Sequence, residues 1–194
     1  MPEFVETIVI GGGQAGLAIS YHLAQRNREH IIFERGRVAE RWRSERWDSL
    51  AFQFPNMMLR LPEYSYTGDE PEAFMGREGV ARFINDYAAR ISAPLRCGIN
   101  VTSLRQNDRG RLTVQAGEST MEAANVVVAT GPYQLPSIPP CSASLPISVH
   151  QVTVTATRDL RIFRLATCSS LVPGARAARL PRTFARPDGV CSMQ

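Results

Sequence analysis

The segment from Thr7 to Glu34 (TIVIGGGQAGLAISYHLAQRNREHIIFE) constrains the fold more than any other part of the chain. It opens with the β-branched run 7–10, which leads directly into the turn GGGQAG, a pattern typical of a buried parallel strand. Apolar residues at helical spacing follow in 17–24, and Ile31–Phe33 form a second short apolar run. The segment therefore predicts a strand, a tight turn, a helix and a second strand.

Each glycine of the turn has its own physical task. Gly11 allows the tight turn, Gly13 lets the backbone approach a pyrophosphate, and Gly16 lets the helix pack closely on the strand. The helix N-terminus offers unpaired N–H groups and a positive dipole end to the phosphates. Glu34 lies about 20 residues beyond the loop, where a carboxylate accepts both ribose hydroxyls of an adenosine. The unit predicts a site for FAD or NAD rather than NADP, because a carboxylate disfavours a 2′-phosphate.

The rest of the chain up to Ala129 alternates between helix and strand patterns. Residues 35–61, dense in arginine and aromatic residues, predict a long functional loop, and the i, i+3, i+4, i+7 apolar spacing in 77–91 predicts an amphipathic helix. Short runs between 95 and 122 predict a strand and a β-meander, and NVVVA (125–129) predicts a strand buried on both faces. The expected fold class is α/β, a Rossmann-like doubly wound parallel sheet with a small inserted antiparallel β-meander.

The positive net charge of the chain, +4, belongs to its C-terminal part. Residues 1–151 hold 15 arginines against 16 acidic residues, whereas residues 152–194 hold 7 against 2. Because 1–151 contain no basic patch interleaved with aromatic residues, we expect no nucleic-acid partner. The sequence has no run of about 18 apolar residues and no basic-then-apolar leader, so we expect a cytoplasmic protein without a membrane span.

The cysteines and histidines show no pattern of ligands. No C-x-x-C or C-x4-C pair occurs among the widely spaced Cys97, Cys141, Cys168 and Cys191. The three histidines also lack the spacing of metal ligands. We therefore expect neither a metal site nor a redox-active disulfide.

Three groups of motifs give the first part of the chain a resemblance to a known family. They are GGGQAG with Glu34, the tryptophan loop with RW (41–42), RWDSL (46–50) and FPN (54–56), and A-T-G-P-Y-x-x-P at 129–136. Over residues 4–151 the chain resembles FAD-dependent monooxygenases of the flavin-containing monooxygenase and Baeyer–Villiger type. The resemblance implies an incomplete FAD-binding domain over 1–151 and a flavoprotein oxidoreductase that uses NADPH and O2 on a small organic substrate.

The resemblance also implies which residues hold FAD. The glycine loop and Glu34 match the part of the family that holds ADP, and Trp42 matches a loop residue beside the flavin. Val101 matches a strand whose backbone contacts adenine, although a core valine is an equally good interpretation. The expected cofactor-binding residues are Gly11, Gly13, Gln14, Ala15, Gly16, Glu34, Arg35, Trp42, Val101, Thr130 and Gly131. Gln53 and Asn56 are further candidates to face the flavin ring, and no catalytic residue is identified.

After Gln151 the chain departs from the family pattern. A second glycine loop for NADPH should follow, but residues 152–194 contain no strand, glycine loop and helix in that order. If the reading frame is shifted between Cys168 and Phe184, the codons that could encode these residues permit the sequence LVVGAGG(S/P)GCQIAEDL. That sequence restores the order of strand, glycine loop and helix. Two interpretations stay open, a frameshifted remnant of the NADPH-binding domain and a genuine arginine-rich tail, each poorly structured. The alternative to a monooxygenase is accordingly a non-catalytic FAD- or nucleotide-binding fragment.

Overall fold

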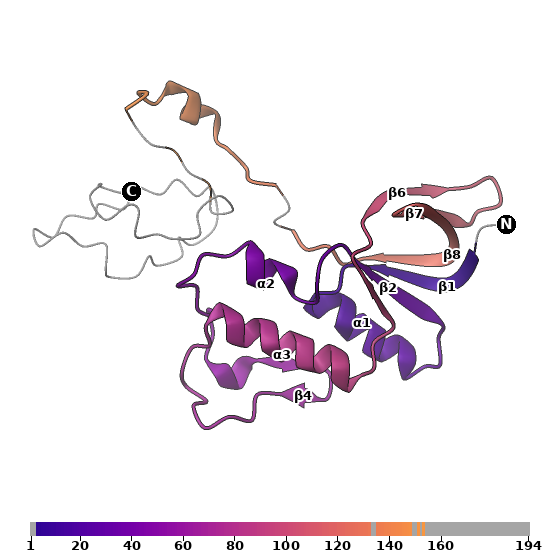
Figure 1. Cartoon of the computed structure of the whole chain (residues 1–194), viewed down its shortest axis with the longest axis horizontal. Helices are drawn as coiled ribbons and strands as arrows, with labels where there is room; N and C mark the ends of the chain where they lie inside the picture. Colours follow the sequence, from indigo (N-terminus) through magenta and orange to yellow (C-terminus); the bar gives the residue numbers. More distant parts are fainter. Residues whose placement is uncertain (1–2, 133–134, 149–150, 152, 154–194) are drawn as a thin grey trace, which may run out of the picture. The chain divides into compact units, whose positions relative to one another are not determined.

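A computed structural model describes residues 3–132, 135–148, 151 and 153 (Figure 1). The chain divides into two compact units, one ending at Gln134 and the other beginning at Leu135. Within the second unit, the described part contains a short 3-10 helix, η2 (Pro140–Ser144). The predicted poor structure of residues 152–194 lies outside the described residues, apart from Thr153.

The first unit begins with the βαβ element that the sequence predicts. Strand β1 (Glu3–Ile10) is followed by helix α1 (Gln14–Ala24) and strand β2 (His30–Glu34). β1 and β2 pair in parallel, with Ile8 beside Ile31. The carboxyl ends of both strands therefore lie at the same edge of the sheet as the glycine turn.

Six strands form one mixed sheet in the order β5-β2-β1-β8-β7-β6. Its other strands are β5 (Leu95–Cys97), β6 (Val101–Gln106), β7 (Leu112–Ala116) and β8 (Ser119–Val128). β5, β2, β1 and β8 run parallel to their neighbours, whereas β8, β7 and β6 form an antiparallel meander. The predicted fold class is confirmed, and β8 is the strand that the parallel and antiparallel parts share.

The predicted strand boundaries change at two places. The sequence predicts one strand from Leu95 to Leu104, but Gly98, with a φ of +75°, separates β5 from β6. Conversely, separate strands near 119–122 and 125–129 are predicted, and the structure joins them into the ten-residue strand β8. The junction at Ala123 and Ala124 carries no turn residue, so the extended backbone continues through it.

The sheet has an apolar core on each face. On one face, Val9 and Ile32 pack with Leu17 of α1 and Tyr87 of α3 (Arg77–Arg90), the predicted amphipathic helix. Figure 1 shows α1 and α3 on the same side of the strands. On the other face, a second core contains Ile8 and residues of the meander, and its buried members are Val5, Ile8, Ile31, Phe33, Val114, Ala116, Met121 and Ala123.

The end of β8 departs from its predicted burial. Strand β7 pairs with β8 only as far as Ala123, and within the described residues the remainder of β8 pairs with β1 alone. Val128 is 63% exposed, and Val126 and Val127 are half-buried. The prediction that residues 125–129 are buried on both faces is therefore wrong, because the meander ends before it reaches them.

The segment 35–61 is mostly irregular, as predicted, but contains two short helices. They are α2 (Glu40–Ser44) and the 3-10 helix η1 (Asn56–Met58). The segment ends in β3 (Arg60–Leu61), which pairs with β4 (Tyr64–Ser65) in a separate two-stranded sheet. Over the described residues, none of the helices has the length and apolar character that crossing a membrane requires.

Candidate dinucleotide-binding site

The glycine turn is shaped by close contacts between backbones. A Cβ atom on Gly16 would lie 1.9 Å from the carbonyl oxygen of Gly11, so α1 packs on the strand only without a side chain there. Gly11 has a φ of +115°, and its Cβ would lie 2.5 Å from the carbonyl oxygen of Ala129. A Cβ on Gly13, in contrast, would meet nothing within 4 Å. Gly11 and Gly16 are thus required by packing, whereas Gly13 faces open space.

The N-terminus of α1 opens onto this space. Gly13 is the N-cap residue and makes no side-chain cap hydrogen bond, and the first backbone bond of the helix runs from Leu17 N to Gly13 O at 3.0 Å. The N–H groups of Gln14, Ala15 and Gly16 have no acceptor among the described residues, as at any helix start. Since Gln14 and Ala15 are exposed, these donors and the positive dipole end can bind an anion.

Glu34 is held at the tip of β2 by two backbone donors. Its Oε2 accepts a hydrogen bond from the N–H of Gly12 at 2.7 Å, and its Oε1 accepts one from the N–H of Gly36 at 2.9 Å. Charged acceptors make short, strong hydrogen bonds, so the carboxylate is fixed before any ligand binds. Gly12 and Gly36 are absent from the set predicted from sequence. The middle glycine of GGG and the glycine after Glu34-Arg35 are the signals that could have pointed to them.

The turn after β8 completes the same edge. Thr130 and Gly131 follow β8 after a single residue, Ala129, and Gly131 has a φ of +80°. A Cβ on Gly11 would lie 3.3 Å from the backbone nitrogen of Thr130. The structure therefore brings the glycine turn, Glu34 and the Thr130-Gly131 turn together at the carboxyl ends of β1, β2 and β8. In open α/β sheets this is the edge at which ligands bind.

Arg35 and Arg41 approach this edge from either side of one carboxylate. Glu45 accepts a hydrogen bond from Arg35 Nη2 on its Oε1 at 2.8 Å and one from Arg41 Nε on its Oε2 at 2.6 Å. Arg41 Nη1 lies 3.9 Å from the position that a Cβ on Gly131 would take. The end of α2 is thus linked through Glu45 to the residue after Glu34, and it lies close to the turn after β8.

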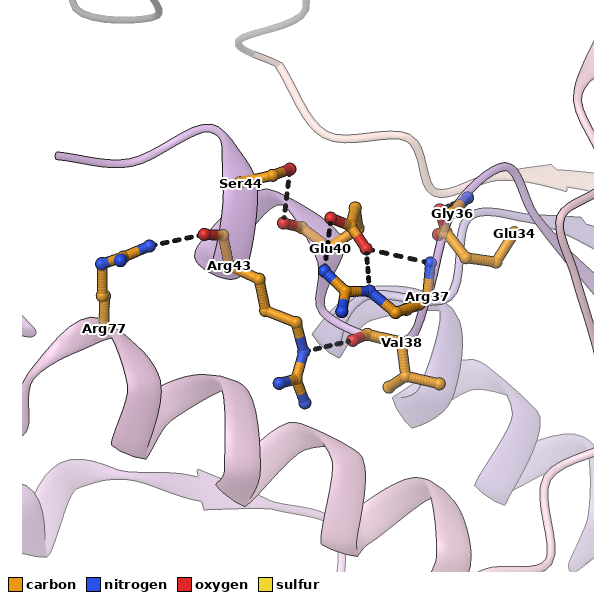
Figure 2. Close-up of polar contacts among 8 residues, drawn as sticks. All are labelled: Glu34, Gly36, Arg37, Val38, Glu40, Arg43, Ser44 and Arg77. Atoms are coloured by element: carbon orange, nitrogen blue, oxygen red, sulfur yellow. Dashed lines mark hydrogen bonds and ion pairs between the residues drawn. The ribbon is translucent and has the colours of Figure 1, made fainter. Parts of the chain in front are cut away.

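Ion pairs and backbone contacts hold the α2 segment in place (Figure 2). Arg37 donates to Oε2 of Glu40 from Nε at 2.7 Å and to Oε1 from Nη2 at 3.0 Å. The hydrogen bond from Arg37 is the largest influence that lowers the pKa of Glu40, to about 2. Arg77, at the start of α3, donates to the carbonyl oxygen of Arg43 and pairs with Asp48 at 2.9 Å. These contacts attach the loop to α3.

Trp42 and Val101 both pack against the core. The Trp42 ring lies 6.4 Å from that of Phe52 between centroids, and the guanidinium of Arg46 lies 5.9 Å above it. Half-buried Val101 opens β6, pairs with Ala116 and packs on the second core. Packing therefore accounts for both side chains, and their contact with a cofactor stays a prediction.

Asn56 and Gln53 differ sharply in their surroundings. Asn56 is 4% exposed, donates from Nδ2 to the carbonyl oxygen of Glu70 at 2.9 Å, and has an Oδ1 atom without a donor among the described residues. Gln53 is exposed. Where the structure is described, Cys97 and Cys141 are free thiols, and no cluster of three His, Cys, Asp or Glu side chains suits a metal ion.

Comparison with known proteins places this geometry in a family. Residues 8–164 match the pyridine nucleotide-disulphide oxidoreductase family. An uncharacterized CzcO-like oxidoreductase of Geobacillus kaustophilus is 36% identical over 90% of this chain and 49% of its own length. The indole-3-pyruvate monooxygenase YUCCA8 of Oryza sativa is 32% identical over 45% of this chain and 21% of its own length. The chain thus spans half or less of these relatives.

Solved structures agree with the sequence matches. The flavin-containing monooxygenase from Stenotrophomonas maltophilia superposes with a TM-score of 0.59 and 26% identity, over 66% of this chain and 39% of that protein. The resemblance to flavin monooxygenases that the motifs predict is thereby confirmed for the N-terminal part of the chain. The chain belongs to the pyridine nucleotide-disulphide oxidoreductase family, as a flavoprotein-type oxidoreductase related to flavin monooxygenases.

Proposed function

We propose that residues 1–151 form the FAD-binding part of a monooxygenase that uses NADPH and O2 on a small organic substrate. The observation that carries the proposal is the fixed carboxylate of Glu34, held by Gly12 and Gly36 beside a helix N-terminus that opens at Gly13. A ribose and the adjoining diphosphate of a dinucleotide require these two groups next to each other.

The hydrogen-bonding groups at this edge of the sheet fit FAD. The N–H groups of Gln14, Ala15 and Gly16 would hold the diphosphate, and Glu34 would accept the ribose hydroxyls. Gly131 would close against the cofactor, Trp42 would lie beside the flavin, and Arg35 and Val101 would border the adenosine. When bound, FAD supplies the electron-transfer and oxygen chemistry, whereas these residues bind it, orient it and exclude water.

The alternative is a non-catalytic FAD- or nucleotide-binding fragment. It is favoured by the absence of a second glycine loop from residues 152–194 of the sequence. The proposal for the whole protein also includes the absence of a nucleic-acid partner, which rests on the charge distribution of residues 1–151.

Two measurements on the purified chain test the proposal and separate it from the alternative. Titration with FAD should give a bound, quenched flavin with a defined stoichiometry, whereas a chain that takes up no FAD would refute both interpretations. Anaerobic NADPH should then bleach the bound flavin if the chain is catalytic. Dithionite is the control, since it reduces any accessible bound flavin without an NADPH site.

We further propose that residues 152–194 are a frameshifted remnant of the NADPH-binding domain. The permitted text LVVGAGG(S/P)GCQIAEDL supports this interpretation. The Geobacillus alignment spans 90% of the chain and so enters residues 152–194, which supports an in-frame tail instead. Sequencing the gene through codons 145–185 decides between them. A gained or lost base that restores the second glycine loop would establish the remnant, and a confirmed frame would refute it.

A further inference from the structure

Glu45 makes an unusual bridge at the C-terminal end of α2. One carboxylate oxygen is bound by Arg35 and the other by Arg41, at 2.8 and 2.6 Å. The Arg41 side chain is 21% exposed and that of Glu45 27%, so this pair is partly shielded from solvent. The Arg35 side chain is 52% exposed, so its half of the bridge is weaker.

The local helix does not account for the Arg41–Glu45 pair. A carboxylate at a helix C-terminus meets the negative end of the dipole, and arginine four residues before glutamate is the less favourable order for such pairs. Helix α2 is also only five residues long. The pair therefore needs a reason outside α2, and the position of the guanidinium supplies one.

The Arg41 guanidinium lies beside the nucleotide edge. Nη1 is the Arg41 atom that comes within 3.9 Å of a Cβ placed on Gly131, while Glu45 holds the same side chain through Nε. Gly131 follows Thr130, whose backbone nitrogen would lie 3.3 Å from a Cβ on Gly11. Arg41 is thus next to the point where the turn after β8 meets the glycine loop.

A diphosphate at the start of α1 would lack a full positive charge from α1 itself. The first turn carries Gln14, Ala15 and Gly16, which are uncharged, so the helix offers only N–H groups and its partial dipole charge. A diphosphate diester carries two negative charges, and arginine is the side chain best suited to bind phosphate oxygens in pairs.

We propose that Arg41 binds the diphosphate of the dinucleotide and that Glu45 is the positioning residue that holds its guanidinium in place. This inference rests on the proposed function, because it needs a dinucleotide at the glycine loop. It adds a cationic contact that comes from α2 rather than from α1.

The test compares FAD, ADP and adenosine as ligands by isothermal titration calorimetry. Arg41→Gln should weaken the binding of FAD and ADP by about tenfold or more, the range for one charged hydrogen bond. The affinity for adenosine should be unchanged, because adenosine has no phosphate. Arg41→Lys keeps the charge and should restore part of the affinity. Glu45→Gln should weaken FAD and ADP by a few-fold, since the guanidinium remains but is no longer held.

Arg111→Gln and Glu122→Gln are the matched controls. This pair, 3.4 Å apart, lies in the meander at the opposite end of β8 from Ala129, so each control makes the same change of charge far from the site. Thermal unfolding of each unliganded variant shows whether it is folded. If Arg41→Gln binds FAD and ADP as tightly as Arg111→Gln does, the inference is wrong.

The same inference is also wrong if Arg41→Gln weakens the binding of adenosine as much as that of ADP. Arg41 would then affect the fold rather than bind phosphate. Failure of the proposed function looks different. In that case the wild-type chain itself binds neither FAD nor ADP. A variant that loses both ligands while the wild type and both controls bind them supports Arg41.

Discussion

The carboxylate of Glu34 and the backbone N–H of Gly12, 22 residues apart in the sequence, are joined by a 2.7 Å hydrogen bond. The residue expected to bind ribose and the turn expected to bind phosphate are therefore one physical unit. A Cβ on Gly12 would lie 3.0 Å from the Cβ of Glu34, so the close approach depends on the glycine as well as on the acid. Damage to either residue should change both stability and ligand affinity.

Glu34→Gln should lower the affinity for FAD about tenfold or more and destabilise the unliganded chain by about 1–2 kcal/mol. The amide keeps the shape of the side chain, but one of its ends now presents N–H groups to the N–H of Gly12 or Gly36. Titration calorimetry and urea unfolding measure the two effects. Glu118→Gln, at an exposed turn, should change neither. Equal affinities of the Glu34 and Glu118 variants would remove Glu34 from the site.

Gly16→Ala and Gly13→Ala should separate packing from binding. The Gly16 Cβ would lie 1.9 Å from the carbonyl oxygen of Gly11, so we expect a loss of at least about 2 kcal/mol in the free energy of unfolding. The Gly13 Cβ would meet nothing within 4 Å, so that variant should remain as stable as the wild type. It should nevertheless bind FAD more weakly, because the methyl group enters the space expected for the diphosphate. Unchanged FAD binding by Gly13→Ala would contradict the placement of the phosphates.

Tyr87→Phe should leave stability unchanged or raise it by about 1 kcal/mol. Tyr87 is fully buried in α3, and its hydroxyl has no hydrogen-bond partner among the described residues. Removing the hydroxyl therefore removes an unsatisfied group while the ring contact with Tyr64, 5.5 Å between centroids, is retained. Chemical denaturation measures the difference. A loss of more than about 1 kcal/mol would show that the hydroxyl has a partner after all.

Acid should destabilise the chain partly through Glu40. Its folded-state pKa of about 2 lies below the ordinary value of 4.5, because Arg37 donates hydrogen bonds to the ionised form. A depressed carboxyl pKa stabilises the fold at pH values above 4.5, and that contribution is lost as the pH falls towards 2. Glu40→Gln should therefore flatten the dependence of unfolding free energy on pH between these values. Glu72→Gln, at an exposed position, should leave the slope as it is.

Sequence patterns predicted the helices and strands that are determined by their own local sequence. The β-branched run 7–10 and the three glycines specify the βαβ unit, and the apolar spacing of 77–91 specifies α3, because both patterns follow from the repeat of the backbone. The burial of Val128 was predicted wrongly for the opposite reason. Burial on both faces depends on what other segments cover, and a strand of valines does not encode where a neighbouring hairpin ends.

Site residues were predictable from the sequence only where a motif requires a particular backbone conformation or a close backbone contact. The glycine turn and Glu34 follow from spacing, but the bonds from Gly12 and Gly36 to Glu34 depend on how two turns approach each other. The bridge from Glu45 to Arg35 and Arg41 is harder still to predict. Many acids and arginines crowd 35–48, and only the path of the folded loop selects which of them meet.

Among the described residues only β1 pairs with the later half of β8, and this has a consequence for how the isolated chain behaves at high concentration. Past Ala123, a backbone edge bearing Val126, Val127 and 63%-exposed Val128 carries no charge or proline to repel a strand from another molecule. We expect light scattering to rise with protein concentration and Val128→Lys to suppress the rise. We therefore expect this short strand edge, rather than the net charge of the chain, to limit the concentration at which the chain stays monomeric.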